Sequence, residues 1–323
     1  MKTQYFVLIS LLLSASGYAS SSPIISLTSD NDAPFGADND YTNGLFFSYT
    51  TAILSDNSRI EPLSLSTQSF DKLEFVLGQK MYTPDNIASS SPVANDRPYA
   101  GFLYTEANYL SILPHRVTRF SVTLGTVGEQ SLARQAQRFV HDITDSEYPN
   151  GWAFQVDEGL VGNLGYLNHY AWHRSTLTNS TQFEISNISE INAGNFRSDA
   201  STGVMLRWGE YLSTSIGAAN IDSERPFRAS ALRNGTIGWF AFSGLEARYR
   251  FNDITIEGDR PGIAEPENYP ATLENKQATI VAGFTWYNTN FGGSLTAAIK
   301  TNDYIEALDS TQGNLSISLF FFL

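Results

Sequence analysis

Hydrophobic and polar residues alternate along several stretches of this chain, each ten or more residues long. In 276–288, Ile280, Phe284 and Trp286 fall on one face of an extended chain, and in 313–323 a hydrophobic residue stands at every second position up to the end. Because the side chains of a strand point alternately to its two faces, each stretch predicts a strand with one apolar face. Such strands are longer than the roughly five or six residues that are usual in globular proteins. The pattern therefore favours a membrane barrel over a soluble sandwich.

The opposite faces of these strands carry Gly, Ser and Thr with few charges, which is typical of a barrel lumen, and Tyr and Trp often lie near strand ends, as in an aromatic girdle. We therefore predict an all-β fold, a transmembrane antiparallel β-barrel of about twelve strands that forms one domain over 20–323. An even strand number is typical of bacterial single-chain barrels. The predicted strands are 24–30, 42–54, 70–80, 99–112, 116–127, 156–173, 181–191, 199–210, 238–252, 276–288, 291–301 and 313–323.

Residues 1–19 have the pattern of a secretory signal peptide. Lys2 supplies a positive charge, residues 6–13 form a short apolar core, and residues 17–19 form a small-x-small cleavage site. The apolar run is shorter than the roughly 18–20 residues that a membrane-spanning helix needs. We therefore expect cleavage after Ala19 and export of the mature chain.

Composition narrows the class of protein further. Charged residues make up 16% of the chain, against about 25% in a typical soluble protein. The net charge is −13 and no basic run is present, which argues against nucleic acid as a partner. The chain has no cysteine, so disulfides, thiolate metal sites and a cysteine nucleophile are excluded.

Barrel topology predicts where the unusual motifs lie. In bacterial barrels both termini and the short turns face the periplasm, and the longer loops face outward. The third outward loop contains the one convincing helix pattern, from Glu129 to Asp145. The links 55–69 and 211–237 are long for periplasmic turns, and the pattern predicts no role for them. Most of the unusual motifs fall in or beside the outward loops 31–41, 81–98 and 128–155.

Strand alternation predicts which polar side chains face the lumen. It places Lys72, Glu74 and Lys80 on the inner face of one strand and turns Thr42 inward from the strand before it. Asp32 also points inward if the first strand extends that far. We therefore expect a carboxylate, a hydroxyl and an ammonium to converge at the outer mouth of the lumen, below the helix of the third loop.

That helix carries His141, with Gln137 four residues earlier on the same face. An imidazole titrates near neutral pH, so His141 is a candidate base that activates a water molecule. The alternative is a structural histidine on the helix surface. No G-x-S-x-G elbow, P-loop or H-E-x-x-H motif is present, so serine-hydrolase and zinc-protease mechanisms lack support.

The first outward loop is rich in carboxylates. Such oxygen donors suit a hard cation such as Ca²⁺, although a solvated acidic loop is the alternative. A cation can polarise an ester carbonyl and stabilise its oxyanion, and Lys80 can add positive charge there. The alternative for Lys80 is an ion pair with Glu74 inside the lumen. The carboxylates are those of Asp30, Asp32, Asp38 and Asp40.

A series of short motifs resembles the lipid A 3'-O-deacylase family of Gram-negative outer membranes. Their order and spacing hold from the mature N-terminus to about residue 160, and weaker similarity continues through 206–209 and 242–249. Asp30 and the locally acidic stretch 36–40 depart from the family pattern. The motifs are Asn31-Asp32, Asp40 to Gly44, Gln79 to Pro84, Asp96 to Gly101, Gln137 to His141, and Gly151-Trp152.

The resemblance implies a twelve-stranded barrel and a Ca²⁺-dependent esterase that removes the 3'-linked acyloxyacyl chain of lipid A. It implies that His141 activates water and that Asp32 helps to hold Ca²⁺. By the same resemblance, Asn31 and Lys80 stabilise the oxyanion, and Thr42 and Gln137 complete the site.

Two other functions fit a polar lumen, namely a pore or transporter and a non-catalytic surface-structural barrel. The expected location is the bacterial outer membrane, with the site facing the outer leaflet, where lipid A lies. We expect a monomer whose partners are lipopolysaccharide and membrane lipid.

Overall fold

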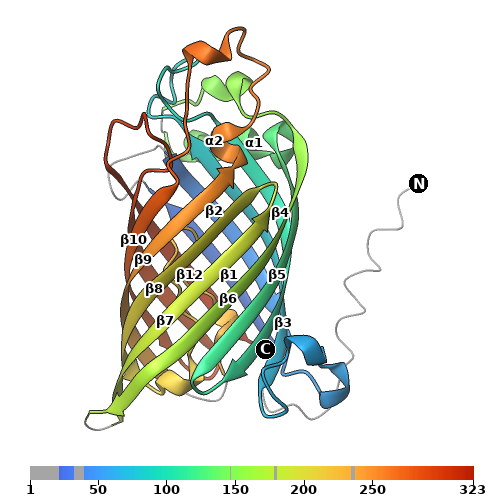
Figure 1. Cartoon of the computed structure of the whole chain (residues 1–323), viewed down its shortest axis with the longest axis vertical. Coiled ribbons are helices and arrows are strands. Elements are labelled where there is room, and N and C mark those ends of the chain that lie inside the picture. Colours follow the sequence, from blue (N-terminus) through green and yellow to red (C-terminus); the bar gives the residue numbers. More distant parts are fainter. Residues whose placement is uncertain (1–21, 33–39, 146, 178–179, 234–236) are drawn as a thin grey trace.

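The computed structural model describes residues 22–32, 40–145, 147–177, 180–233 and 237–323, so the predicted signal peptide lies outside the described residues. Twelve antiparallel strands form a closed barrel, which confirms the predicted fold class (Figure 1). The strands are β1 Ile24–Asn31, β2 Asp40–Thr50, β3 Phe70–Thr83, β4 Ala100–Leu113, β5 Arg116–Val127, β6 Gly159–Thr176, β7 Thr181–Gly194, β8 Arg197–Glu210, β9 Gly238–Asp253, β10 Lys276–Tyr287, β11 Phe291–Thr301 and β12 Thr311–Phe322.

Each strand pairs with its neighbours in the chain, and the barrel closes where β1 meets β12. Ile24 pairs with Thr50 on one side and with Phe322 on the other. The long stretch predicted as 156–173 is a single strand, β6, as the even strand number required. The described chain ends lie together, because the Leu323 N–H donates to the Pro23 carbonyl at 2.9 Å.

The two faces of the wall follow the predicted alternation. Apolar side chains such as Leu77, Phe284 and Leu319 are exposed on the outside, whereas serines, threonines and charged residues are buried inside. Exposed apolar rows of this kind match the lipid-facing band of outer-membrane barrels. Within the described residues, no helix is both long and apolar enough to cross a membrane.

The helices are short and lie mainly at the barrel end opposite the chain ends, here called the α1 end (Figure 1). The predicted helix 129–145 is split, because Leu132 adopts a left-handed backbone with φ of 59° between its two parts. They are η5 Gly128–Ser131 and α1 Ala133–Thr144. The others are η3 Asp56–Ser58, η4 Glu61–Leu63, η6 Gly151–Phe154, η7 Leu212–Thr214, η8 Ala229–Ala231, α2 Ile254–Glu257 and η9 Pro266–Asn268.

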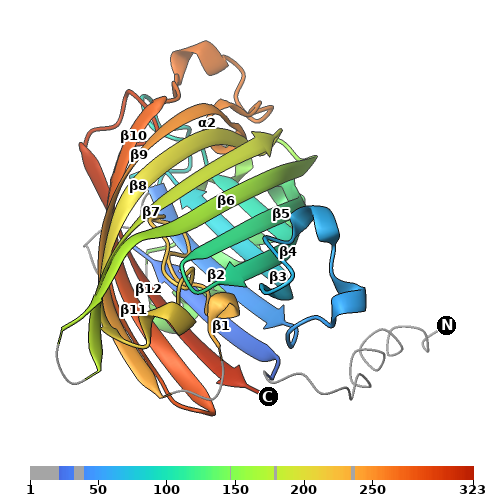
Figure 2. The same ribbon diagram turned by 60° about the horizontal axis from the view of Figure 1, so that its bottom comes forward.

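The long link between β8 and β9 folds into the lumen, which explains its length (Figure 2). Its described residues, 211–233 and 237, are here called the plug. Ile216, Ile221 and Phe227 of the plug pack with lumen-facing apolar residues such as Phe320. The Lys72 ammonium donates to the carbonyl of Leu232 at 2.7 Å. The plug therefore fills part of the lumen with its own hydrophobic core.

Candidate functional site

Four strands bring the sequence motifs together at the α1 end. Asn31 pairs with Asn43, Asn43 with Met81, and Met81 with Gly101. Because neighbouring strands lie about 4.8 Å apart, Asn31 and Gly101 are roughly 14 Å apart along this rim. Motifs that are distant in the sequence therefore share one rim.

Thr42 occupies an irregularity in this rim. The β2–β3 register shifts between Tyr41 and Asn43. The alternation of inward and outward side chains over the rest of β2 therefore does not determine which way Thr42 points. Its hydroxyl lies 2.6 Å from the hydroxyl of Thr83. The Asn31 side chain and the Asp32 N–H both donate to the Thr42 carbonyl, each at 3.4 Å. Asn31, Asp32 and Thr42 therefore form one contact group.

Asn31 faces the outside of the barrel. Its neighbour Asp30 faces the lumen, where its carboxylate accepts from the Tyr41 hydroxyl and from the N–H of Arg225 in the plug. Since successive strand residues alternate, Asn31 points away from the lumen, on the same face as its partner Leu315. Asp32 follows the end of β1 and is buried.

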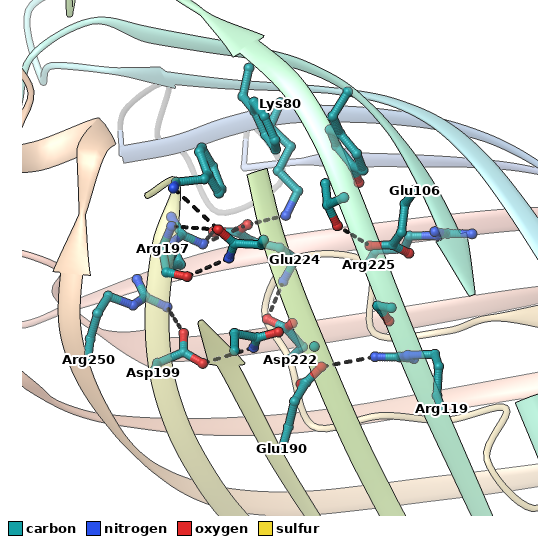
Figure 3. A pocket seen from close by; sticks show the side chains of 18 of the residues that line it. Lys80, Glu106, Arg119, Glu190, Arg197, Asp199, Asp222, Glu224, Arg225 and Arg250 are labelled. Atoms are coloured by element: carbon teal, nitrogen blue, oxygen red, sulfur yellow. Dashed lines mark hydrogen bonds and ion pairs between the residues drawn. The ribbon is translucent and has the colours of Figure 1, made fainter. Parts of the chain in front are cut away.

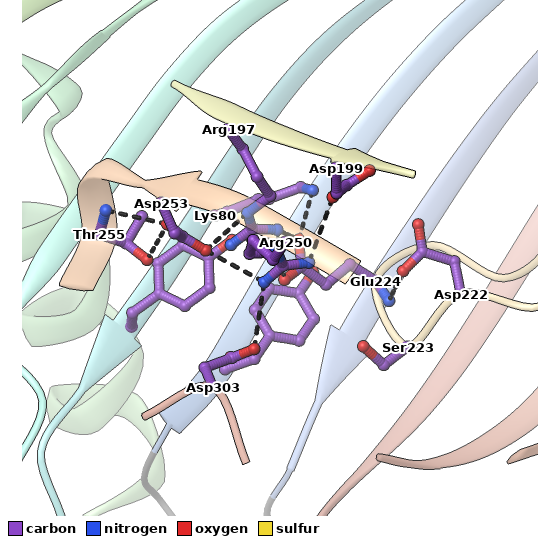
Figure 4. A network of polar contacts seen from close by, with 12 residues as sticks. Lys80, Arg197, Asp199, Asp222, Ser223, Glu224, Arg250, Asp253, Thr255 and Asp303 are labelled. Atoms are coloured by element: carbon purple, nitrogen blue, oxygen red, sulfur yellow. Dashed lines mark hydrogen bonds and ion pairs between the residues drawn. The ribbon is translucent and has the colours of Figure 1, made fainter. Parts of the chain in front are cut away.

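Lys80 faces the lumen, as predicted, but its partner differs from the one considered. Its ammonium lies 2.6 Å from the Glu224 carboxylate in the plug (Figure 4). Glu74 instead pairs with Arg225 at 3.0 Å. Burial disfavours the charged form of Glu224, but Arg197 and Lys80 outweigh it and hold the pKa of this carboxyl well below its usual value. Lys80 is therefore on the opposite face of the wall from Asn31.

Helix α1 packs against the outer face of β3 and β4. A Cβ atom on Gly101 would collide with the side chains of Ser131 and Ala133, so glycine is what allows the helix to approach the strand. The Gln79 side chain donates to the Ser131 carbonyl at 2.7 Å. Met81 and Ala133 share a small apolar cluster. The start of α1 is thereby fixed on the outer side of the rim.

The face of α1 turned toward the strands carries two polar residues. Gln137 and His141 follow Ala133 at intervals of one helical turn and are only 2% and 7% exposed. His141 is therefore covered by its surroundings, and its role as a base rather than a structural residue stays a prediction.

Trp152 fixes the orientation of the Gln137 amide. The indole N–H donates to Gln137 Oε1 at 2.7 Å, and the ring packs on Tyr99 with centroids 4.8 Å apart. Because an indole N–H can only donate, the Gln137 atom that it contacts must be the amide oxygen. The amide nitrogen, Nε2, therefore occupies the other position of the amide group. That Nε2 is buried and has no acceptor among the described residues. Sequence reasoning had quoted Trp152 within a motif without giving it this role.

A backbone carbonyl orients the ring of His141. Nδ1 lies 2.5 Å from the carbonyl oxygen of Glu147. Because a carbonyl oxygen only accepts, Nδ1 carries the proton in the neutral ring, and Nε2 is then the basic nitrogen. A histidine held in this tautomer has the form that a general base requires.

The acidic loop divides into residues with different partners. Asp38 lies outside the described residues, and Asp30 is tied to the plug. Asp40 lies 3.7 Å from the buried guanidinium of Arg97. No group of three or more Asp, Glu, His or Cys side chains in the described ranges is placed to hold a metal ion. Asp32 offers a buried carboxylate, the kind of oxygen ligand that a hard cation prefers, and its backbone N–H donates to the Thr42 carbonyl at 3.4 Å.

The lumen holds a second polar cluster, which sequence reasoning did not identify. It surrounds a cavity of about 100 Å³ between the plug and the wall (Figure 3). Arg197 pairs with Glu224 and Asp253, and Arg248 pairs with Asp199. The alternation of arginines in β9 was visible in the sequence, but the plug carboxylates that face the wall were not. Plug and ion pairs together argue against an open pore.

A family model and a solved structure agree with this architecture. The family model described as "Outer membrane protein LpxR" matches residues 5–321. The structure of LpxR from Salmonella typhimurium matches with a TM-score of 0.78 at 17% identity, covering 93% of this chain and all of that one. The β domain of the Bordetella autotransporter BrkA matches with a TM-score of 0.46 at 8% identity, covering 94% of this chain and 99% of that one. No curated protein sequence matches the chain.

Proposed function

The chain belongs to the LpxR family of outer membrane proteins, the lipid A 3'-O-deacylases, and from this premise we propose that it is a Ca²⁺-dependent esterase that removes the 3'-linked acyloxyacyl chain of lipid A. The observation that carries the proposal is the buried polar face of α1. It presents the basic nitrogen of an oriented imidazole, and one turn away an amide N–H without an acceptor among the described residues.

His141 is the base in this mechanism. Its Nε2 takes a proton from a water molecule as that water attacks the ester carbonyl, while the Glu147 carbonyl stabilises the protonated ring through Nδ1. The tetrahedral intermediate then collapses with cleavage of the ester C–O bond, the acyl chain leaves as a carboxylic acid, and His141 returns its proton to the departing sugar oxygen. The N–H groups of Gln137 Nε2 donate to the carbonyl oxygen as it becomes an oxyanion. From Ala133 to His141 the helix rises about 12 Å, and the proposed mechanism requires that this rise runs from Gly101 toward β1 and β2.

Asn31, Asp32 and Thr42 form the strand side of the site. Asn31 offers a second amide donor on the outer face, and Thr42 sets the local geometry through its carbonyl. Asp32 would hold the Ca²⁺ ion. When bound, this ion supplies positive charge that polarises the ester carbonyl and stabilises its oxyanion.

Lys80 does not join this group in the observed arrangement. Its ammonium would have to leave Glu224 and cross to the other face of the wall to reach the oxyanion. We therefore give Lys80 a positioning role: its ion pair with Glu224 holds the plug against the lumen face of β3, the strand that also carries Met81.

The outer face of the wall suits a lipid substrate. An ester bond of a lipid in the adjoining leaflet can reach the α1 rim without entering the lumen. With both termini in the periplasm, as is usual for such barrels, the α1 end faces the outer leaflet, where lipid A lies.

The test is mass spectrometry of lipid A incubated with purified protein in detergent micelles. With Ca²⁺, the wild type should release the 3'-linked chain, and EDTA should stop the release until Ca²⁺ is restored. His141→Ala should abolish release, whereas His115→Ala, in the β4–β5 turn, should retain it. An unchanged acyl pattern with wild type and Ca²⁺ would refute the esterase and favour a non-catalytic barrel.

A further inference from the structure

The side chains of α1 are distributed in the reverse of the usual manner. Its face toward the strands carries Gln137 and His141, while Phe139 and Ile143 point away and are 66% and 68% exposed. A helix on the surface of a water-soluble protein buries its apolar stripe and exposes its polar one. The exposed stripe of α1 therefore needs an apolar environment that the chain itself does not provide within its described residues.

The position of α1 indicates what this environment is. The helix lies on the outer face of β3 and β4, the face that contacts lipid further along the same strands. Leu77 of β3 is 53% exposed there, and Leu124 of β5 and Leu160 of β6 are also exposed. The apolar stripe of α1 and the lipid-facing band of the barrel therefore lie on the same outer side of the wall.

Residues beside the stripe fit the boundary between lipid and water. The guanidinium of Arg138 lies over the ring of Tyr148 at 5.1 Å, and Tyr148 itself is exposed. Arginine and tyrosine are amphipathic side chains that commonly occupy membrane interfaces. Gln135 and Asp142 lie on the remaining face of α1 and are exposed. The helix thus has a face toward the barrel, an apolar face and a polar face.

We propose that the apolar face of α1, formed by Phe139, Val140 and Ile143, lies in the acyl-chain region of the membrane leaflet at the α1 end. The bulk lipid of this leaflet is the partner, and the contact fixes the depth of α1 in the bilayer. Under the function proposed above, this depth keeps His141 at the level of the ester linkages of neighbouring lipids. The membrane contact itself does not depend on catalysis.

The experiment uses nitroxide labels, because the chain has no native cysteine. Phe139→Cys and Ile143→Cys report on the apolar face, and Gln135→Cys and Asp142→Cys are matched controls on the polar face of the same helix. Leu77→Cys is the reference for lipid contact. The labelled full-length proteins are reconstituted into phosphatidylcholine–phosphatidylglycerol vesicles, and collisions of each nitroxide with oxygen and with a water-soluble nickel chelate are measured.

Labels at 139 and 143 should collide more often with oxygen than with the chelate, in a ratio similar to that at 77. Labels at 135 and 142 should favour the chelate. Equal chelate access at all four helix positions would show a face in water, and exclusion of both probes at 139 and 143 would show a covering protein. Either result would overturn the proposal.

The result for the membrane contact can be interpreted independently of folding defects and of enzyme activity. Each variant is checked for the mobility shift on heating that folded barrels show in gels, and positions 139 and 143 report independently, so loss of one variant leaves the other. The probe ratios require no turnover. If they are as expected while wild-type protein leaves lipid A intact, the membrane contact stands and the esterase fails.

Discussion

The lumen and the outer rim of the α1 end are both rich in polar groups, yet they differ in how those groups are satisfied. In the lumen Lys80, Arg197 and Arg225 each lie within 3.0 Å of a carboxylate. At the rim Gln137 keeps a buried donor that has no acceptor within the described residues. Arg225 also keeps buried guanidinium N–H groups without an acceptor among the described residues, so what distinguishes the lumen is that its charges are paired with opposite charges, which indicates a structural role. The unmatched Gln137 donor instead lies one helical turn from the candidate base His141, which indicates a place for a ligand. Variants of the lumen should therefore affect stability, and variants of the rim should affect catalysis.

Glu224→Gln should give the largest effect and should act on stability alone. It leaves Lys80 and Arg197 with a neutral partner in a buried cluster, and breaking such a pair costs about 3–5 kcal/mol. Urea unfolding in lipid vesicles would measure the loss, with the exposed residue Glu267 as the control in Glu267→Gln. A normal unfolding free energy, or a loss of turnover without a loss of stability, would break the proposed division between lumen and rim.

Gln137→Met should lower the catalytic rate, in contrast to Glu224→Gln, which should lower stability. It keeps the length of the side chain but removes both donors, and loss of one oxyanion donor typically lowers kcat about 10²–10³-fold. Initial rates of acyl release in mixed micelles would measure this, with Gln135→Met on the exposed face of α1 as control. An unchanged kcat would remove Gln137 from the chemistry and leave His141 without a neighbouring donor.

Trp152→Phe should have a smaller effect on the same step. The phenyl ring can still pack on Tyr99, but the N–H that fixes the Gln137 amide is lost. Loss of one hydrogen bond of about 1–1.5 kcal/mol corresponds to a roughly tenfold lower kcat. Tyr99→Phe, which removes a hydrogen bond to the Ile87 carbonyl in the same cluster, serves as control.

A double-mutant cycle sharpens the assignment of Trp152. If this residue acts through the amide, Trp152→Phe should add little to Gln137→Met, because the group to be oriented is already absent. Fully additive losses in kcat would show that Trp152 contributes by another route.

The smallest expected effect is on the pH dependence of the unfolding free energy. Because the folded-state pKa of Glu224 is lowered, its contribution to stability is present in full above the pKa of the unfolded chain and is lost as pH falls toward the folded value. The unfolding free energy should therefore change little through Glu224 between pH 7 and 5 and should fall below about pH 4.3. Glu224→Gln should remove this part of the acid sensitivity. Identical acid profiles for the two proteins would contradict the assignment.

The strands could be predicted from sequence because a period of two is a local property. Phe284 and Trp286 reveal their shared face without knowledge of any other strand. Lys80 was placed on the lumen face for the same reason. The strand count and the closed barrel then followed from length and evenness.

What the sequence could not predict depends on contacts between distant segments. The plug has no periodic pattern, so nothing local indicates that Glu224 meets Lys80 across 144 positions of sequence. The inward direction predicted for Thr42 assumed regular strand alternation, and the one-residue irregularity at this position interrupts that alternation. The orientation of Gln137 requires Trp152, which lies beyond the end of the helix. Whether Asp32 binds Ca²⁺ stays a prediction.

The plug has a consequence for how the barrel is assembled. β1 and β12 are the first and last strands made, and they meet only when the wall is complete. The plug contacts each of them at one position: the Arg225 N–H donates to Asp30 of β1, and the Ser223 carbonyl accepts from Asn314 of β12. In the folded barrel the plug therefore ties together the two strands that close the wall, and closure of the barrel and insertion of the plug depend on the same contacts.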